Sequence, residues 1–304
     1  MAIVHVTRML PGGALERLCS AHEVTVWPGS LPPSPEELRD SVRDAQGLLC
    51  LLTERVDRAL LDAAPALGAI ANYAVGTDNI DLALARERGI AVGVTPDVLT
   101  EATADLAFAL LLAAARRLSQ AAADARAGRW RTWEPAGWLG ADVHGATLGI
   151  VGFGRIGKAL ARRAEGFAMT VRSTADTPLD ELLATSDFVS VHCPLTERTR
   201  GLIGADALAR MRPSAILINT ARGAIVDQGA LRTALERGEI AGAAIDVTDP
   251  EPPPPGDPIF DIPNLIVVPH IGSATHTARA RMTELSVENL LAALAGRPMP
   301  HPAP

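Results

Sequence analysis

The sequence lacks most features of disulfide-rich and nucleic-acid-binding proteins. Its three cysteines, Cys19, Cys50 and Cys193, are odd in number and form no C-x-x-C pair, which argues against a disulfide framework or a zinc knuckle. Lys158 is the only lysine, and 28 basic against 35 acidic residues give a net charge of −7. Without a basic surface to hold a phosphate backbone, we expect no nucleic-acid partner. The free thiols predict a reducing, cytoplasmic compartment.

Long hydrophobic runs are also missing. The longest near a membrane length, Leu106–Ala115, spans about half of a bilayer. The N-terminal stretch contains His5 and Arg8 and lacks the basic start, long apolar core and cleavage site of a signal peptide. We therefore expect no membrane segment and no secretion signal. Motifs of the H-E-x-x-H and G-x-S-x-G type are absent, so zinc or serine hydrolase chemistry has no candidate residues and no metal site is predicted.

What is present is a regular alternation of short apolar runs and helical patterns. The chain has 304 residues, 48% of them apolar and 21% charged, which indicates a folded protein of about two domains. Strands of four or five residues between helices of about ten are typical of βαβ units and parallel sheets. In the first part of the chain, the predicted strand and helix pairs are Ile3–Val6 with Gly13–Ala21, Leu48–Leu52 with Val56–Ala64, and Ala69–Tyr73 with Ile80–Arg88.

A second series of the same kind begins at Thr147 and contains six predicted strands, which together predict a doubly wound sheet. Between the two series, Thr100–Leu118 is apolar on most sides and is predicted to form one long buried helix. Thr277–Ala295 is predicted as a last helix, and residues 296–304 as too rich in proline to pack regularly. The predicted strands are Leu148–Val151, Met169–Ser173, Phe188–His192, Ala215–Asn219, Gly242–Val247 and Leu265–Val268.

A glycine motif follows the first strand of this second series. Gly152, Gly154 and Gly157 have the G-x-G-x-x-G spacing, with Phe153 and then Arg155 and Ile156 between them. In this pattern the first glycine allows a tight turn, the second allows backbone to approach a pyrophosphate, and the third allows close packing of helix on strand. Because the motif lies between a predicted strand and a predicted helix, we interpret it as a dinucleotide-binding turn, with a plain glycine turn as the alternative.

The choice between NAD and NADP depends on the end of the next strand. Asp176 lies 19 residues beyond Gly157, near the place where an acid binds the adenosine ribose and favours NAD. Arg172 and the pair Ser173 and Thr174 lie just before it and could instead hold a 2′-phosphate. Asp176 could also be a solvated turn residue. The sequence favours NAD over NADP.

Three successive strands each deliver a chemically active residue at the carboxyl end. Arg222 follows the strand ending at Asn219, Glu251 follows the next strand, and His270 the last one. Ligands bind at the carboxyl edge of open α/β sheets. A guanidinium can hold a carboxylate, and an acid bonded to one imidazole nitrogen favours the protonated ring, whose other nitrogen can protonate a carbonyl oxygen. Each residue alone could be a salt-bridge partner, a loop charge or a core histidine.

Together, these segments resemble the D-isomer-specific 2-hydroxyacid dehydrogenases, and most closely their glyoxylate/hydroxypyruvate reductase branch. The resemblance covers nearly the whole chain in collinear order. Its segments are NYAVGTDNID (72–81), TPDVLTEATADLAFALLLAAARR (95–117), GIVGFGRIGKALARR (149–163), VHCPLTERTR (191–200), LINTARGAIVD (217–227) and PHIGSAT (269–275).

The resemblance implies two Rossmann-like domains with a cleft between them and a homodimer built largely through the cofactor domains. The substrate domain would comprise 1–98 plus 277–304, and the dinucleotide-binding domain 99–276. It also implies that Arg222 binds the substrate, Glu251 supports the histidine, and His270 donates the proton. Leu51, Val75 and Gly76 would contact the substrate together with Arg222 and His270. The predicted cofactor contacts are Thr103, Gly152, Phe153, Gly154, Arg155, Ile156, Gly157, Asp176, His192, Pro194, Thr220, Ala221, Arg222, Asp246, His270 and Gly272.

The predicted activity is the NAD(P)H-dependent reduction of a small 2-oxo acid, with hydride from the nicotinamide and a proton from His270. Two departures from the family pattern stand out. The interval between Met169 and Leu179 is about a dozen residues shorter than usual, which leaves cofactor choice open, and the interval from Glu251 to His270 is about one residue longer. The alternatives are phosphoglycerate, formate or phosphite as substrate, a nucleotide-sensing binding protein resembling a corepressor, or an inactive relative.

Overall fold

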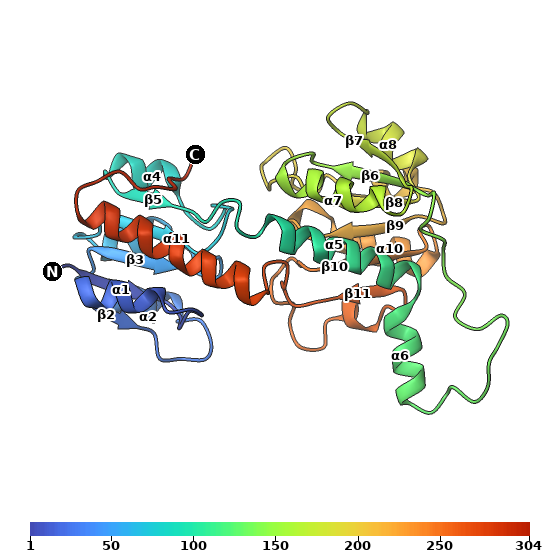
Figure 1. Ribbon diagram of the computed structural model, residues 1–304, viewed down its shortest axis with the longest axis horizontal. Helices are drawn as coiled ribbons and strands as arrows, with labels where there is room; N and C mark the ends of the chain where they lie inside the picture. Colours follow the sequence, from blue (N-terminus) through green and yellow to red (C-terminus); the bar gives the residue numbers. More distant parts are fainter. The chain divides into compact units, whose positions relative to one another are not determined.

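The computed structural model describes all 304 residues, which form two compact units (Figure 1). Unit 1 comprises Met1–Leu99 and Ala274–Pro304, and unit 2 comprises Thr100–Ser273. These limits differ by one and three residues from the predicted ones at 98/99 and 276/277. Each unit contains one parallel sheet with helices on both faces. The predicted α/β class with two doubly wound sheets is confirmed.

Unit 1 contains a five-stranded sheet in the order β2-β1-β3-β4-β5. The chain adds β2 on one side of β1 and β3 to β5 on the other, so the loops that follow β1 and β3 leave the sheet at its switch point. All four residues of β3 and of β4 are buried, as expected for central strands covered on both faces. The strands are β1 (Ile3–Val6), β2 (Glu23–Val26), β3 (Gly47–Cys50), β4 (Ala69–Asn72) and β5 (Ala91–Gly93).

Helices from both ends of the chain cover this sheet. One face packs against α1 and α11 through residues such as Leu18 and Leu290, and the other packs against α2, α3 and α4. Figure 1 shows α11, in red, lying along the sheet beside α1, although the two are far apart in sequence. The helices are α1 (Ala14–Ala21), α2 (Pro35–Ser41), α3 (Arg58–Ala63), α4 (Leu82–Glu87) and α11 (His276–Leu294).

Three elements of unit 1 have no counterpart in the sequence prediction: β2, β5 and α2. The start of α2 did carry a sequence signal, because Ser34 and Glu37 form a capping box in which each side chain bonds the other residue's backbone amide. The expectation for residues 296–304 was wrong. Val94 N–H donates to His301 O at 2.9 Å, and Ala303 N–H donates to Val92 O at 2.8 Å, so this segment pairs with the edge strand β5.

Unit 2 contains a six-stranded sheet in the order β11-β10-β9-β8-β6-β7. All six predicted strands are present, and all pairings are parallel. Because β7 and β8 lie on opposite sides of β6, the switch point is between β6 and β8. The strands are β6 (Thr147–Val151), β7 (Thr170–Ser173), β8 (Phe188–Val191), β9 (Ile216–Asn219), β10 (Gly242–Ile245) and β11 (Leu265–Val267).

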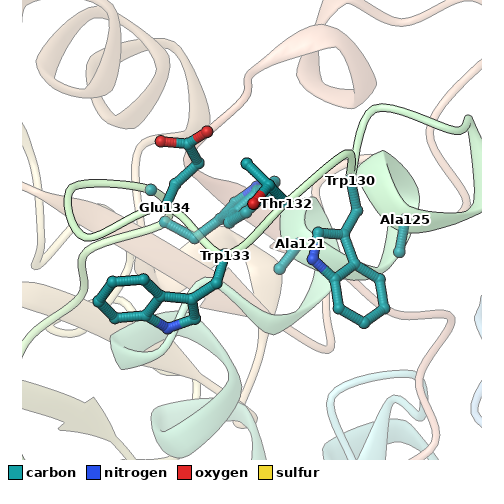
Figure 2. A pocket seen from close by; sticks show the side chains of 8 residues that line it. Ala121, Ala125, Trp130, Thr132, Trp133 and Glu134 are labelled. Carbon is teal, nitrogen blue, oxygen red and sulfur yellow. The ribbon is translucent and has the colours of Figure 1, made fainter.

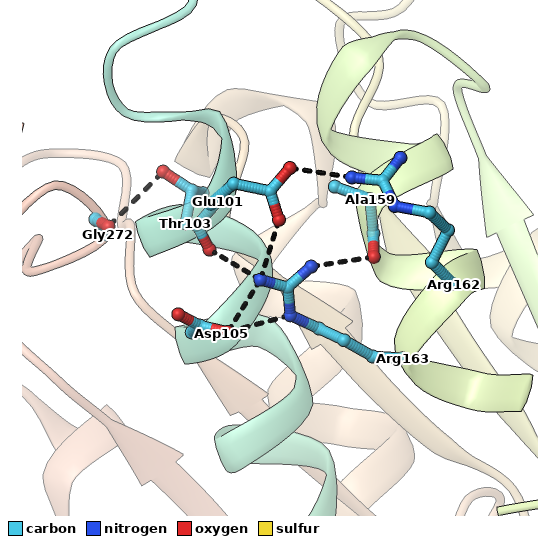
Figure 3. Close-up of polar contacts among 7 residues, drawn as sticks. All are labelled: Glu101, Thr103, Asp105, Ala159, Arg162, Arg163 and Gly272. Carbon is cyan, nitrogen blue, oxygen red and sulfur yellow. Dashed lines mark hydrogen bonds and ion pairs between the residues drawn. The ribbon is translucent and has the colours of Figure 1, made fainter. Parts of the chain in front are cut away.

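Two apolar layers hold the helices of unit 2 onto its sheet. Leu111 of α5 and Leu160 of α7 pack on one face, while α8, α9 and α10 pack on the other. The amino end of α5 is tied to α7 by ion pairs of Arg163 with Glu101 at 2.9 Å and with Asp105 at 2.6 Å (Figure 3). The helices are α5 (Thr100–Ala115), α6 (Leu118–Arg126), α7 (Arg155–Glu165), α8 (Leu179–Thr185), α9 (Ala205–Arg210) and α10 (Gln228–Arg237).

The predicted single helix over Thr100–Leu118 is wrong at its carboxyl end. Arg117 adopts a left-handed conformation with φ of 52°, which ends α5, and α6 begins at Leu118 in a new direction. No single helix has the length and apolar character needed to cross a membrane, and the pair α5 and α6 reaches these criteria only if its two bent members are counted together.

Candidate active site

The glycine turn after β6 is built so that two of its three glycines cannot carry a side chain. Gly152 has a φ of +97°, and a Cβ atom there would lie 2.3 Å from the Cys193 nitrogen, which follows β8. A Cβ atom on Gly157 would lie 2.5 Å from the Gly152 carbonyl oxygen. These two glycines therefore allow the tight turn and the close approach of α7 to the sheet that the motif predicts.

Gly154 differs, because a Cβ atom there would meet nothing within 4 Å. It is the N-cap of α7, and no side chain caps the first amides of this helix. The first turn of α7 also contains no acidic residue. Open space in front of uncapped helix amides is suited to an anion such as a pyrophosphate. The glycine turn thus fits a dinucleotide, with Phe153, Arg155 and Ile156 in the intervening positions.

Asp176, which follows β7, already has hydrogen-bond partners for one of its carboxylate oxygens. Asp176 is exposed, and its Oδ1 accepts hydrogen bonds from Ser173 N at 3.3 Å, Ser173 Oγ at 3.1 Å and Thr177 Oγ1 at 3.2 Å. These bonds lower the pKa of the Asp176 carboxyl, with the Ser173 hydroxyl as the largest cause. One carboxylate oxygen is therefore turned back onto the end of its own strand.

Two polar side chains at the ends of β8 and β9 have buried atoms without partners. Val191 pairs with Asn219 in the sheet, so His192 and Thr220 are the next residues of neighbouring strands. His192 Nε2 is bonded to Ser190 Oγ at 2.8 Å, while His192 Nδ1 and Thr220 Oγ1 are buried with no hydrogen bond. Burial lowers the pKa of His192 to about 4, so the ring is neutral at neutral pH. A bound nucleotide could satisfy such groups.

His270 and Glu251 are in direct contact. His270 Nδ1 lies 2.5 Å from Glu251 Oε1, and the two side chains are 25% and 31% exposed. The other oxygen of this carboxylate accepts the Thr248 amide at 3.3 Å. With Nδ1 held by the acid, Nε2 is the ring nitrogen left to donate a proton. The longer interval between the two residues therefore does not separate them.

The loop that carries Arg222 packs against the loop that carries Glu251. Arg222 directly follows Asn219, Thr220 and Ala221 at the end of β9, and its carbonyl accepts the Asn219 side-chain amide at 2.9 Å. The next residue, Gly223, packs on the loop that follows β10, where a Cβ atom would lie 2.0 Å from the Thr248 carbonyl. The loops that carry Arg222 and Glu251 are therefore adjacent.

The turn that carries His270 is held by a buried acid at the end of β10. Asp246 accepts the Ile271 amide at 2.6 Å and the Gly272 amide at 2.7 Å, and its carbonyl accepts the His270 amide at 3.0 Å. Burial raises the pKa of the Asp246 carboxyl. Asp246 was predicted only as a cofactor contact, and this positioning role was missed. The sequence signal that could have indicated this role is the position of Asp246 near the end of a predicted strand, one residue before Val247.

Thr103 of α5 completes this cluster. Its hydroxyl donates to the Gly272 carbonyl at 3.2 Å, as Figure 3 shows, and the residue is 5% exposed. A Cβ atom on Gly272 would lie 3.1 Å from Asp246 Oδ2 and 3.3 Å from the Thr103 methyl group. Thr103, Asp246 and Gly272 are thus brought together next to His270. Pro194, by contrast, is exposed in the loop after β8.

The predicted substrate residues of unit 1 lie in the loops that follow β3 and β4. Leu51 donates its amide to Glu54 at 2.7 Å, and Gly76 accepts the Asn72 side-chain amide at 2.8 Å. Val75, next to Gly76, is 40% exposed. The loop is further tied by Asn79, which bonds Asn72 and the Leu51 carbonyl. This buried polar network was not predicted, since amide and acid side chains in loops give no periodic signal.

A tryptophan-rich arm extends from unit 2 (Figure 1). It consists of α6 and the loop 127–142, and Asp124 of α6 holds the loop to the helix by accepting Trp138 Nε1 at 2.8 Å and the Arg129 guanidinium. A pocket of about 360 Å³ lies within the arm, and Figure 2 shows Trp130 and Trp133 on either side of Thr132. Trp130 is 67% and Trp133 80% exposed.

Comparisons with known proteins show the family to which the chain is similar. Residues 108–272 match the model of the D-isomer specific 2-hydroxyacid dehydrogenase NAD binding domain. The chain is 48% identical to a glyoxylate reductase of Korarchaeum cryptofilum, over 95% of this chain and 92% of that one. Among solved structures, a protein of Thermus thermophilus has a TM-score of 0.94 and 51% identity, over 99% of this chain and 100% of that one. An NADPH-dependent glyoxylate/hydroxypyruvate reductase of Sinorhizobium meliloti, solved with NADP and malonate, has a TM-score of 0.84 and 34% identity over 99% and 96%.

Proposed function

We propose that this chain, which belongs to the D-isomer specific 2-hydroxyacid dehydrogenase family, reduces glyoxylate and hydroxypyruvate to the corresponding 2-hydroxy acids. The chain is an NAD(P)-dependent oxidoreductase that acts on 2-oxo acids. The choice of these two substrates rests on its relatives, which include the glyoxylate reductases of Korarchaeum cryptofilum and Thermococcus litoralis. The comparisons favour neither a corepressor-like binding protein nor phosphoglycerate, formate or phosphite as substrate.

The observation that carries this proposal is the bond between His270 Nδ1 and Glu251 Oε1. In the proposed reaction, His270 donates a proton from Nε2 to the carbonyl oxygen while Glu251 stabilises the charged ring. Arg222 binds the substrate carboxylate, since a guanidinium is a permanent cation with two parallel donors. Leu51, Val75 and Gly76 remain predicted substrate contacts on the basis of the resemblance.

Unit 2 is proposed to hold the nucleotide. The amides at the start of α7 would bind the pyrophosphate, and Gly154 leaves room for it. His192 and Thr220 would supply polar partners at the ends of β8 and β9, and Thr103 and Asp246 would support the loop of residues 270–272. The reduced nicotinamide, when bound, supplies the hydride that reaches the carbonyl carbon.

A steady-state comparison tests the proposed activity. Oxidation of NADH and of NADPH is followed at the nicotinamide absorbance band with glyoxylate, hydroxypyruvate and pyruvate. We expect turnover with both glyoxylate and hydroxypyruvate and a lower kcat/KM for pyruvate. Absence of turnover with every 2-oxo acid, in a chain that still binds the nucleotide, would contradict the proposed function.

We also propose that the chain forms a homodimer through the tryptophan-rich arm. A monomer would leave Trp130, Trp133, Leu118 and Leu139 exposed to water by 55% or more, and such a patch is typical of an interface. Light scattering on the wild type and on a Trp130→Ser, Trp133→Ser double variant tests this, with a dimer expected only for the wild type. A monomeric wild type would contradict it.

The three free thiols support a reducing, cytoplasmic compartment.

A further inference from the structure

The residue that touches the glycine turn from β7 is Thr174. Thr174 directly follows β7, and its amide donates to the Ile150 carbonyl at 3.0 Å, which extends the pairing with β6 by one residue. Its hydroxyl accepts the Gly152 amide at 3.0 Å. The residue is exposed at the carboxyl edge of the sheet. Thr174 therefore borders the turn that is proposed to bind the pyrophosphate.

No carboxylate lies at this position. Asp176 is two residues further on, and its Oδ1 is engaged by the amide and hydroxyl of Ser173 at the strand end. The one guanidinium carried by β7 is that of Arg172, which pairs with Glu181 of α8 at 3.1 Å. The strand end thus presents a neutral hydroxyl, while one oxygen of the nearest acid is bonded to Ser173 and the guanidinium is paired with Glu181.

In dinucleotide-binding folds, an acid at the end of the second strand binds the ribose 2′-hydroxyl and repels a 2′-phosphate. We infer that Thr174 takes the place of this acid and that the chain consequently binds NADH and NADPH with similar affinity. A hydroxyl both donates and accepts. Since Thr174 Oγ1 accepts the Gly152 amide, its own proton is available for a ribose oxygen or a phosphate oxygen. The inference deepens the proposed function and rests on its nucleotide site.

Calorimetric titration with two fragments tests the inference without turnover: ADP-ribose and its 2′-phosphate. For the wild type we expect dissociation constants that agree within about 10-fold. Thr174→Asp should weaken binding of the 2′-phosphorylated fragment by at least about 10-fold, because a carboxylate repels the phosphate. The same change should leave ADP-ribose binding unchanged or make it tighter, because a carboxylate can accept a hydrogen bond from the ribose 2′-hydroxyl. Thr174→Ser, which keeps the hydroxyl, should behave like the wild type.

A second variant, Asp176→Asn, tests whether residue 174 or residue 176 borders the adenosine ribose. If Thr174 borders the ribose, neutralising Asp176 should alter the ratio of the two dissociation constants by less than about 3-fold. A loss of ADP-ribose binding of about 10-fold or more in Asp176→Asn, or an unchanged ratio in Thr174→Asp, would overturn the inference. Failure of the wild type to bind either fragment would overturn it together with the nucleotide site. Binding of both fragments without any turnover would contradict only the proposed reaction.

Discussion

Gly223 packs directly against Thr248, and a Cβ atom on Gly223 would lie 2.0 Å from the Thr248 carbonyl. This contact joins the loop that carries Arg222 to the loop that carries Glu251, whose Oε2 accepts the Thr248 amide. The position of the Arg222 loop relative to the acid that contacts His270 therefore depends on the absence of a side chain at Gly223.

Gly223→Ala should separate the two loops and destabilise the chain by about 1–3 kcal/mol, because backbone atoms cannot yield to a methyl group as a flexible side chain can. We expect kcat/KM to fall by at least about 10-fold. Urea denaturation and steady-state kinetics measure both effects. Gly229→Ala is the control, since a Cβ atom there makes only an ordinary contact at 3.4 Å, and it should change neither value appreciably.

His270 and Glu251 should be separable by their effects on kcat. His270→Gln removes the proposed proton donor and should lower kcat by roughly 10²–10⁴-fold, the range for general acid catalysis. Glu251→Gln keeps a side chain of the same shape but removes the charge that stabilises the protonated ring, and we expect a smaller loss of about 10–100-fold. Near-normal turnover of His270→Gln, measured with nucleotide binding intact, would exclude the assigned role.

Substitutions of the glycines in the turn should differ in their effect on the free energy of unfolding and on nucleotide binding. Gly157→Ala places a Cβ atom 2.5 Å from the Gly152 carbonyl and should lower the free energy of unfolding by about 1–3 kcal/mol. A Cβ atom at Gly154 meets nothing within 4 Å. Gly154→Ala should therefore lower the free energy of unfolding by about 1 kcal/mol or less, yet weaken nucleotide binding. Denaturation and calorimetric titration of both variants check this. Unchanged binding in Gly154→Ala would show that no pyrophosphate approaches there.

His192 should make stability depend on pH. Its folded pKa of about 4 lies below the usual value of 6.5, so the unfolded chain binds a proton that the folded chain does not as pH falls between these values. The free energy of unfolding therefore decreases in this window, by about 2 kcal/mol between about pH 7.5 and pH 5 from this residue. His192→Gln should remove that part of the decrease. Parallel urea titrations at the two pH values measure it, and equal decreases in both proteins would contradict the prediction.

Much of the fold could be predicted because its signals are local. The apolar runs of unit 2 place all six strands. The edge strand β2 was missed since only Val24 and Val26 of its four residues are apolar and neither is fully buried. The end of α5 was missed because its break depends on a left-handed Arg117, which composition does not reveal.

The candidate site likewise has features that the sequence predicts and features that it does not. The placement of Arg222, Glu251 and His270 after three neighbouring strands, at one sheet edge, follows from strand order, since the carboxyl ends of parallel strands share an edge. The anchoring of residues 270–272 by Asp246 does not follow from it, nor does the contact of Thr174 with Gly152. Both depend on distances between residues more than twenty positions apart.

The amino-acid sequence by itself determined the α/β class, the glycine turn and the residue types delivered at the strand ends, because periodicity and spacing encode these along the chain. Tertiary structure alone decided which hydroxyl borders the glycine turn, which way Asp176 faces and how closely Gly223 approaches Thr248. The physical reason is that hydrogen bonds and close contacts between loops are set by the packed sheet, to within a few tenths of an ångström, and no local pattern specifies them.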